Sequence, residues 1–200
     1  MKPEIQDAVS RTYEIRVLGT AKEVCSEADI VVLAVKPKQV PEVFAEGLDL
    51  GGKVLISIVA GLTLEKLRAY VPDAKNIRVM PNHCCMVLEG AMGYCCDPSV
   101  TDADKAAVAD ILGSVGLAVE VGEEYMDAIT GIAGSSPAFL YLVIDAMADA
   151  GVLNGLSRAD STRLAAQSML GAAKMVLETD RKSTRLNSSH RSLSRMPSSA

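Results

Sequence analysis

The feature that most constrains the fold is an unbroken apolar run at residues 30–35, Ile-Val-Val-Leu-Ala-Val. Runs this rich in β-branched residues are typical of parallel strands that are covered on both faces. Further apolar runs at 54–59 and 77–80 follow, and a segment with helical spacing of apolar residues separates each run from the one before. Alternation of strands and helices at this spacing predicts an α/β fold with a parallel, doubly wound sheet.

The remaining elements follow from the same periodicities. We expect helices at 4–13, 21–28, 38–47, 64–70 and 102–112, and additional strands at 14–18, 91–95 and 117–121. From residue 123 onward the pattern predicts helices alone, at 135–150 and 157–178. The sequence therefore divides into an α/β domain, residues 1–122, and an all-helical domain, residues 123–180.

Both ends of the sequence depart from a complete domain of this kind. A doubly wound nucleotide-binding sheet normally opens with a strand and a glycine-rich turn, G-x-G-x-x-G, and no such motif occurs in the 200 residues. Because residues 4–13 have the pattern of a crossover helix, we expect an incomplete sheet that lacks its first strand. Residues 181–200 contain seven serines and no acid, which predicts a disordered, non-native tail.

Polar side chains stand where the predicted strands end. Lys36 follows the first run, Ser57 lies near the end of the second, and Asn82 follows the third. Ligands of open α/β sheets bind at the carboxyl ends of the strands, so these residues predict a binding site. The plainer alternative is that Lys36 is a solvated charge and that Ser57 and Asn82 only form turns.

A small-residue loop precedes the long apolar segment 138–150. Pro137 suits a first helical turn, Ser136 a helix N-cap, and Gly151 a helix end. The backbone amides at such a helix start, with Ser135 and Ser136 beside them, would bind a carboxylate or phosphate. The alternative is a helix start that merely caps itself. A helix this apolar must be buried against its own core or against another subunit.

Composition excludes several classes of protein. The net charge of −5 argues against a nucleic-acid-binding surface, and the apolar run 138–144 is too short to span a bilayer. We see no secretory signal, and five cysteines, an odd number, do not form a disulfide framework. These features predict a cytoplasmic protein with neither nucleic acid nor membrane as partner.

One cluster of side chains suggests two hypotheses, a zinc site and plain core packing. Its members are His83, Cys84, Cys85, Cys95 and Cys96, and they lack the C-x2-C spacing of structural zinc sites. Cysteine is among the most buried residue types, so core packing is the favoured interpretation, and we expect no metal.

Several motifs together resemble the pyrroline-5-carboxylate reductase family. They are ADIVVLAVKP at 28–37, SIVAG at 57–61, RVMPN at 78–82, EG at 89–90, MDAITGIAGSSPAF at 126–139 and LAAQSMLGAAKMVLET at 164–179. The resemblance implies a Rossmann-type domain followed by a helical dimerisation domain, assembled as homodimers and rings of dimers. It implies hydride transfer from NADPH or NADH to the C=N bond of 1-pyrroline-5-carboxylate, a small-molecule substrate, which gives L-proline in proline biosynthesis.

The resemblance also implies roles for individual residues, matched motif by motif. Ser135 and Ser136 would hold the substrate carboxylate, and Glu123 and Ser135 would be catalytic, with Glu123 near the imine nitrogen. The cofactor would contact Ala34, Val35, Lys36, Pro37, Ser57, Ala60, Gly61 and Asn82.

Some positions depart from the family pattern. His83-Cys84 replaces Thr-Pro, and Ser136 replaces a glycine, from which we hypothesise that its hydroxyl caps the helix amides and competes with the substrate. The glycine-rich turn and the family's last helices are absent, so cofactor preference is open. Two alternatives remain: a non-catalytic, truncated dimerisation fragment, and a β-hydroxyacid dehydrogenase. The second would need a lysine and an asparagine one turn apart on the long helix, and 135–150 contains neither.

Overall fold

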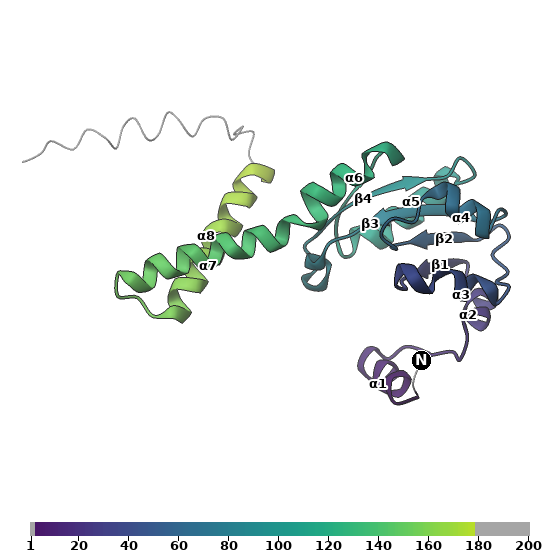
Figure 1. Cartoon of the computed structure of the whole chain (residues 1–200), viewed down its shortest axis with the longest axis horizontal. Coiled ribbons are helices and arrows are strands. Elements are labelled where there is room, and N and C mark those ends of the chain that lie inside the picture. The colour runs from purple at the N-terminus through teal and green to yellow at the C-terminus, as the bar shows by residue number, and fades with distance from the viewer. Residues whose placement is uncertain (1–2, 179–200) are drawn as a thin grey trace, which may run out of the picture. The chain divides into compact units, whose positions relative to one another are not determined.

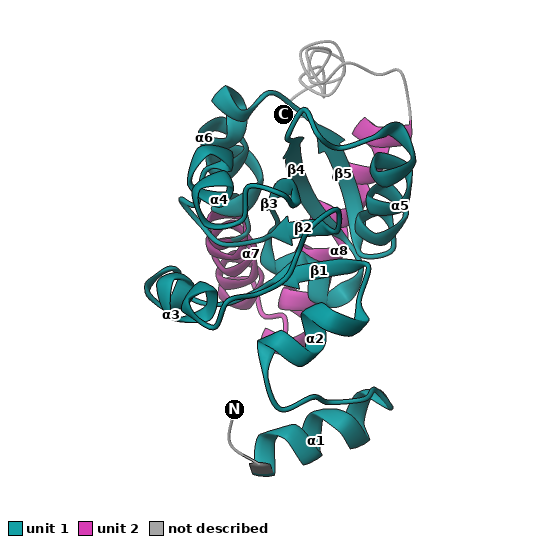
Figure 2. Ribbon diagram, turned by 90° about the vertical axis from the view of Figure 1, so that its right-hand side faces the viewer, with its two compact units in different colours: residues 1–137 teal, residues 138–200 magenta. Residues whose placement is uncertain are grey.

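The computed structural model describes residues 3–178 (Figure 1). The predicted tail, 181–200, lies outside the described residues. The chain divides into two compact units, residues 1–137 and 138–200 (Figure 2). The first unit holds the sheet and the second a helical hairpin, and the domain boundary near residue 122 stays a prediction.

The first unit contains, within the described residues, a five-stranded sheet in the order β1-β2-β3-β4-β5. The strands are β1 (Ile30–Leu33), β2 (Val54–Ser57), β3 (Lys75–Met80), β4 (Gly90–Cys96) and β5 (Gly116–Glu120). The α-helices are α1 (Pro3–Tyr13), α2 (Ala21–Glu27), α3 (Val40–Ala45), α4 (Leu64–Tyr70), α5 (Asp102–Gly113) and α6 (Met126–Ile129). Short 3-10 turns lie at η1 (Pro37–Gln39), η2 (His83–Val87) and η3 (Glu123–Tyr125), and a π-helical turn, η4, at Thr130–Gly134.

Both faces of the sheet are covered, as the apolar runs predict. All four residues of β2 are buried, and its three apolar residues alternate between the two cores. Leu55 packs in one core with Leu67 of α4 and Met126 of α6. Val54 and Ile56 pack in the other with Val108 of α5. Figure 2 shows α5 on one side of the sheet and α4 and α6 on the other. The α/β fold class is therefore confirmed.

Two strands, β4 and β5, run against the predicted direction. β1, β2 and β3 are parallel, but β4 pairs antiparallel to β3, with Arg78 opposite Cys95. The connection from β3 to β4 holds only the turn η2, and a parallel pair needs a crossover of a dozen or more residues. α5 supplies such a crossover between β4 and β5, which are parallel.

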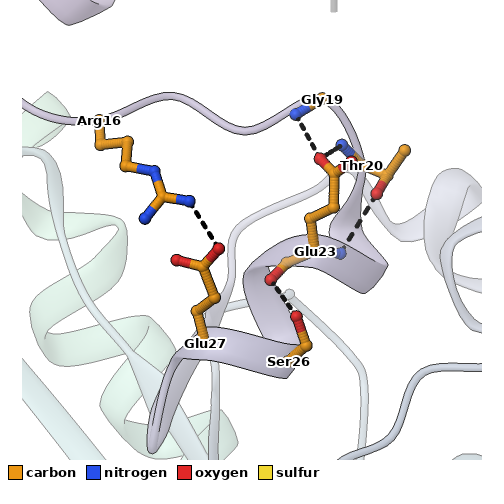
Figure 3. Close-up of polar contacts among 6 residues, drawn as sticks. All are labelled: Arg16, Gly19, Thr20, Glu23, Ser26 and Glu27. Atoms are coloured by element: carbon orange, nitrogen blue, oxygen red, sulfur yellow. Dashed lines mark hydrogen bonds and ion pairs between the residues drawn. The ribbon is translucent and has the colours of Figure 1, made fainter.

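The predicted strand at 14–18 is wrong. These residues have no strand geometry, and Glu14 has a positive φ of 52°. A strand needs a neighbour, and in the described sheet β1 pairs only with β2. The segment is instead held by side chains: Ser10 donates to the Ile15 carbonyl, and Arg16 pairs with Glu27 of α2 at 2.6 Å (Figure 3).

Helix α2 begins with a capping box, which Figure 3 shows. The Thr20 hydroxyl accepts from the Glu23 amide at 3.2 Å, and the Glu23 carboxylate accepts from the Thr20 amide at 3.2 Å. This reciprocal pair satisfies amides that a helix start leaves without partners. It fixes where the helix that leads into β1 begins.

The described part of the second unit is formed by α7 (Ser136–Leu153), apart from its first two residues, and by α8 (Arg158–Glu178). α7 runs past Gly151, so the prediction that Gly151 ends the helix is wrong. A Cβ on Gly151 would lie 2.5 Å from the Ser161 hydroxyl, so glycine allows α8 to approach α7 closely. The turn between the helices uses Gly155 at a φ of 94°.

The apolar residues of this hairpin are largely exposed within the chain. Leu164 and Val176 of α8 are 61% and 58% exposed, and Leu142 of α7 is 68% exposed. Burial of these residues against the chain's own core is therefore not observed. One described stretch, Glu123–Leu153, is long and apolar enough to cross a membrane by length and composition, a test that apolar helices of soluble proteins also pass.

Candidate functional site

The predicted cofactor residues lie at one edge of the sheet. Because β1, β2 and β3 are parallel, Lys36, Ala60 and Asn82, which follow them, all emerge at the carboxyl ends of the strands. Ala34, Lys36 and Pro37 are exposed and Val35 is partly buried. These residues therefore lie at the predicted edge of the sheet, while the contact of each residue with a cofactor stays a prediction.

A cavity of about 480 Å³ opens at this edge. Three of the predicted residues, Pro37, Ala60 and Gly61, line it, and Gly61 has a positive φ of 73°. The other lining residues were not predicted: Val40, Pro41, Val59, Leu62, Lys66, Ala69 and Tyr70. Five of them lie on α3 and α4, and the helical spacing of those segments does not reveal that the two helices border one cavity.

Ser57 has a different environment from the exposed residues of this edge. It is fully buried, and its hydroxyl accepts a hydrogen bond from the Val59 amide at 3.3 Å. This bond shapes the turn that leads from β2 to Ala60 and Gly61. Ser57 therefore stabilises the turn whose residues line the cavity.

Asn82 connects three segments of the chain. Its side-chain oxygen accepts from the amides of Cys84 and Ala91, both at 3.2 Å. Its side-chain nitrogen donates to the Ala133 carbonyl in the π-helical turn at 3.1 Å. The turn packs closely there, because a Cβ on Gly134 would lie 3.0 Å from Met80 Cε. The small-residue loop is thus held against the end of β3.

The start of the long helix differs from the prediction. α6, the π-helical turn and α7 follow one another directly, so α7 does not begin after a free loop. The Ser136 hydroxyl donates to the Ile132 carbonyl instead of accepting from helix amides. The N-cap role of Ser136 is therefore wrong, and with it the hypothesis that its hydroxyl competes for those amides. Ser135 is exposed, and its amide donates to the Thr130 carbonyl at 2.9 Å.

Glu123 is held by two other elements. One carboxylate oxygen accepts from the Leu64 amide at the start of α4 at 2.8 Å and from the Arg78 guanidinium at 3.2 Å. Arg78 is only 8% exposed, so its guanidinium is poorly solvated and Glu123 supplies the opposite charge that compensates for this. The sequence analysis missed Arg78, whose only signal was its place in the RVMPN motif.

Part of the cysteine cluster packs in the core: Cys95 lies in one core, Cys85 and Cys96 pack against the other, and His83 is exposed. Burial raises the pKa of the Cys95 and Cys96 thiols to about 11. Within residues 3–178, no three His, Cys, Asp or Glu side chains gather closely enough to hold a metal ion.

Comparison with known proteins places this architecture. Residues 123–193 match the family described as pyrroline-5-carboxylate reductase dimerisation, and residues 1–61 match the family described as NADP oxidoreductase, coenzyme F420-dependent. A solved pyrroline carboxylate reductase of Plasmodium falciparum, with NADP bound, is 36% identical, with a TM-score of 0.78 over 92% of this chain and 69% of that one. The chain belongs to the pyrroline-5-carboxylate reductase family.

Other members of the family agree with this assignment. The pyrroline-5-carboxylate reductase of Methanosarcina acetivorans is 43% identical over 168 residues, which cover 82% of this chain and 62% of the relative. The Coxiella burnetii pyrroline-5-carboxylate reductase structure has a TM-score of 0.85 at 27% identity, over 100% of this chain and 74% of that one. The chain thus spans 62% of the length of the first curated relatives that it matches.

Proposed function

We propose that this protein reduces 1-pyrroline-5-carboxylate to L-proline with a hydride from NADPH, or from NADH. Family membership supports the reaction class. The observation that carries the proposal is that Asn82 brings the small-residue loop to the edge where the parallel strands end. An imine ring and a nicotinamide must meet at such an edge for hydride transfer, and position is most of what this chemistry asks of a protein.

The residues present fit one end of the cofactor. The cavity lined by Pro37, Ala60 and Gly61 is concave and mostly apolar, as a flat nicotinamide ring requires, and the exposed Lys36 adds a cation beside it. The sequence contains no glycine-rich turn for the pyrophosphate, so the fit is limited to this end. When bound, the cofactor supplies the hydride. Of the predicted contacts, Ala34, Val35, Lys36, Pro37, Ala60 and Gly61 would touch the cofactor. Ser57 is fully buried, and the Asn82 side chain is bonded to Cys84, Ala91 and Ala133, so these two would support the site without touching the ring.

The substrate side rests on the segment around Ser135. Its exposed hydroxyl is free to turn toward a carboxylate, whereas the Ser136 hydroxyl is committed to Ile132. Hydride addition to the carbon of a protonated C=N bond leaves an amine, so no nucleophile is needed. Since the Glu123 carboxylate accepts from Leu64 and Arg78, we assign it to holding α4 and the loop before it.

The same proposal covers assembly and cellular location. A homodimer formed through residues 123–180, extended to rings of dimers, would cover the exposed apolar side chains of α7 and α8. We place this protein in the cytoplasm, as the sequence predicts.

Turnover of the purified chain tests the proposal. We expect NADPH absorbance to fall when 1-pyrroline-5-carboxylate is added, with L-proline as the product. Ser135→Ala should raise the KM for the substrate by about fivefold, the loss of one hydrogen bond. Ser26→Ala, which removes an exposed hydroxyl on α2, is the matched control. A chain that dimerises but neither binds NADPH nor forms proline would replace the proposal with the non-catalytic alternative.

A further inference from the structure

We propose that Asn82 is a positioning residue that supplies the hydrogen bond Pro137 cannot make, and so fixes the loop that carries Ser135. The inference rests on the proposed function, because it deepens the account of the same site. It connects two motifs, the end of β3 and the start of α7, that lie far apart in the sequence.

The argument begins with the proline. In a continuous helix the Ala133 carbonyl would accept from the amide of residue 137, four positions later. Pro137 has no N–H, and its ring crowds that carbonyl. The helical path from Met126 to Leu153 shows the expected consequence, since a π-helical turn occupies Thr130–Gly134 immediately before the proline's turn.

The Asn82 side chain then completes the arrangement. Its amide nitrogen lies 3.1 Å from the Ala133 oxygen, and this contact is partly buried. The carbonyl of the same side chain is fixed by the Cys84 and Ala91 amides, so the amide group is held in one orientation. A buried carbonyl without a donor is costly, so the bond selects this geometry of the turn.

The consequence for the site is a defined place for Ser135. Ser135 follows the π-helical turn directly, and its amide is bonded back to Thr130 of that turn. A shift of the turn would carry the Ser135 hydroxyl away from the strand ends. Asn82 therefore acts on the substrate through the loop, without touching it.

A double-mutant cycle between Asn82 and Pro137 tests this inference. Asn82→Asp keeps the oxygen that accepts from Cys84 and Ala91 but replaces the donor with an oxygen that repels the Ala133 carbonyl. We expect amide hydrogen exchange at residues 131–136 to rise about fivefold in N82D, as for the loss of one hydrogen bond. Pro137→Ala restores a backbone donor, so in the P137A background N82D should raise exchange by less than about twofold.

Asn154→Asp is the matched control. Asn154 makes the same kind of bond, from its side-chain nitrogen to the Ala150 carbonyl at 2.8 Å, away from the π-helical turn. It should leave exchange at 131–136 unchanged. Unchanged exchange in N82D, or an equal rise with and without Pro137, would overturn the inference.

Kinetics separate positioning from general stability. N82D should raise the KM for 1-pyrroline-5-carboxylate about fivefold while kcat and the KM for NADPH stay within about twofold. A fall in kcat and rises in both KM values by the same factor would contradict a positioning role. Absence of turnover in the unmutated chain would remove the proposed function instead, and the exchange cycle would still decide whether Asn82 holds the turn.

Discussion

The Glu123 carboxylate connects η3 to two other elements, because it pairs with Arg78 on β3 and accepts from the Leu64 amide at the start of α4. The carboxylate serves a backbone amide of α4 and a guanidinium on β3 at once. Arg78 is nearly buried, so the pair cannot be broken without leaving a charge poorly solvated. A residue whose family position suggested chemistry thus has a clear role in holding the site.

Replacing Glu123 distinguishes its two contacts. Glu123→Ala should lower the free energy of unfolding by about 1–3 kcal/mol, because both donors lose their acceptor. Glu123→Gln keeps an oxygen for the Leu64 amide and should lose less. Urea unfolding of the three proteins measures both effects, and equal stability of E123A and the unmutated chain would contradict the assigned contacts.

Asp104 gives the chain a pH dependence at low pH. Hydrogen bonds from Lys75 and then Thr101 lower the pKa of its carboxyl from 3.8 to about 2. A lowered pKa means that the ionised form stabilises the fold above pH 3.8 and that this stabilisation is lost as the pH falls toward 2. Asp104→Asn should therefore be less stable at neutral pH, and thermal unfolding should show the difference shrinking as the pH falls through that window.

The residue types at the site were predictable, but their contacts were not. Lys36, Ser57 and Asn82 could be placed at one edge because the carboxyl ends of parallel strands coincide. The Ala133 partner of Asn82 lies 51 positions away in the sequence, and the partners of Glu123 lie 45 and 59 positions away, beyond the reach of local patterns. The cap expected at Ser136 failed because Pro137 lies inside a continuing helical path and not at its start.

At the scale of elements, periodicity predicted whether a segment is a strand or a helix better than it predicted strand direction or strand pairing. The apolar runs located β1, β2 and β3, and the helical spacing gave the bounds of α4 directly. The direction of β4 depends on the short connection before it, and the strand expected at 14–18 depends on a neighbour that the described sheet lacks. Neither the direction of β4 nor the pairing of residues 14–18 can be predicted from the sequence of the segment alone.

Gly151 sets the approach of α7 and α8. A methyl group there would lie 2.5 Å from the buried Ser161 hydroxyl. Gly151→Ala should therefore lower the stability of the hairpin by about 1–3 kcal/mol, despite the better helix propensity of alanine. Gly171→Ala in α8 is the control, because a Cβ there meets no atom within 4 Å, and it should stabilise by about 0.5–1 kcal/mol. If thermal unfolding gave both variants the same gain, the close approach would be refuted.

At the scale of the whole molecule, the exposed apolar surface of the helical hairpin favours association with another subunit. Phe139 and Leu142 of α7 and Leu177 of α8 are 63%, 68% and 75% exposed. Soluble monomers rarely expose apolar patches of such extent, and residues 123–193 match a dimerisation family. Assembly and site are linked, since the helical segment that carries Ser135 continues into this hairpin.

Light scattering of the purified chain should therefore report a dimer or a larger assembly of dimers. Leu142→Arg, which places a charge on the apolar surface, should shift the protein toward monomer. Lys22→Asp, an exposed charge change on α2, should leave the mass unchanged. A monomer at all accessible concentrations would remove the proposed dimer.

The measurement that tests the central claim most directly is amide chemical-shift mapping with NADP⁺ and L-proline added together. If the strand ends and the Ser135 loop form one site, shifts concentrate at Ala60, Gly61 and Ser135, and the Asn154→Asp control reproduces them. Shifts confined to other parts of the chain, or no shifts at saturating concentrations of both ligands, would contradict the account.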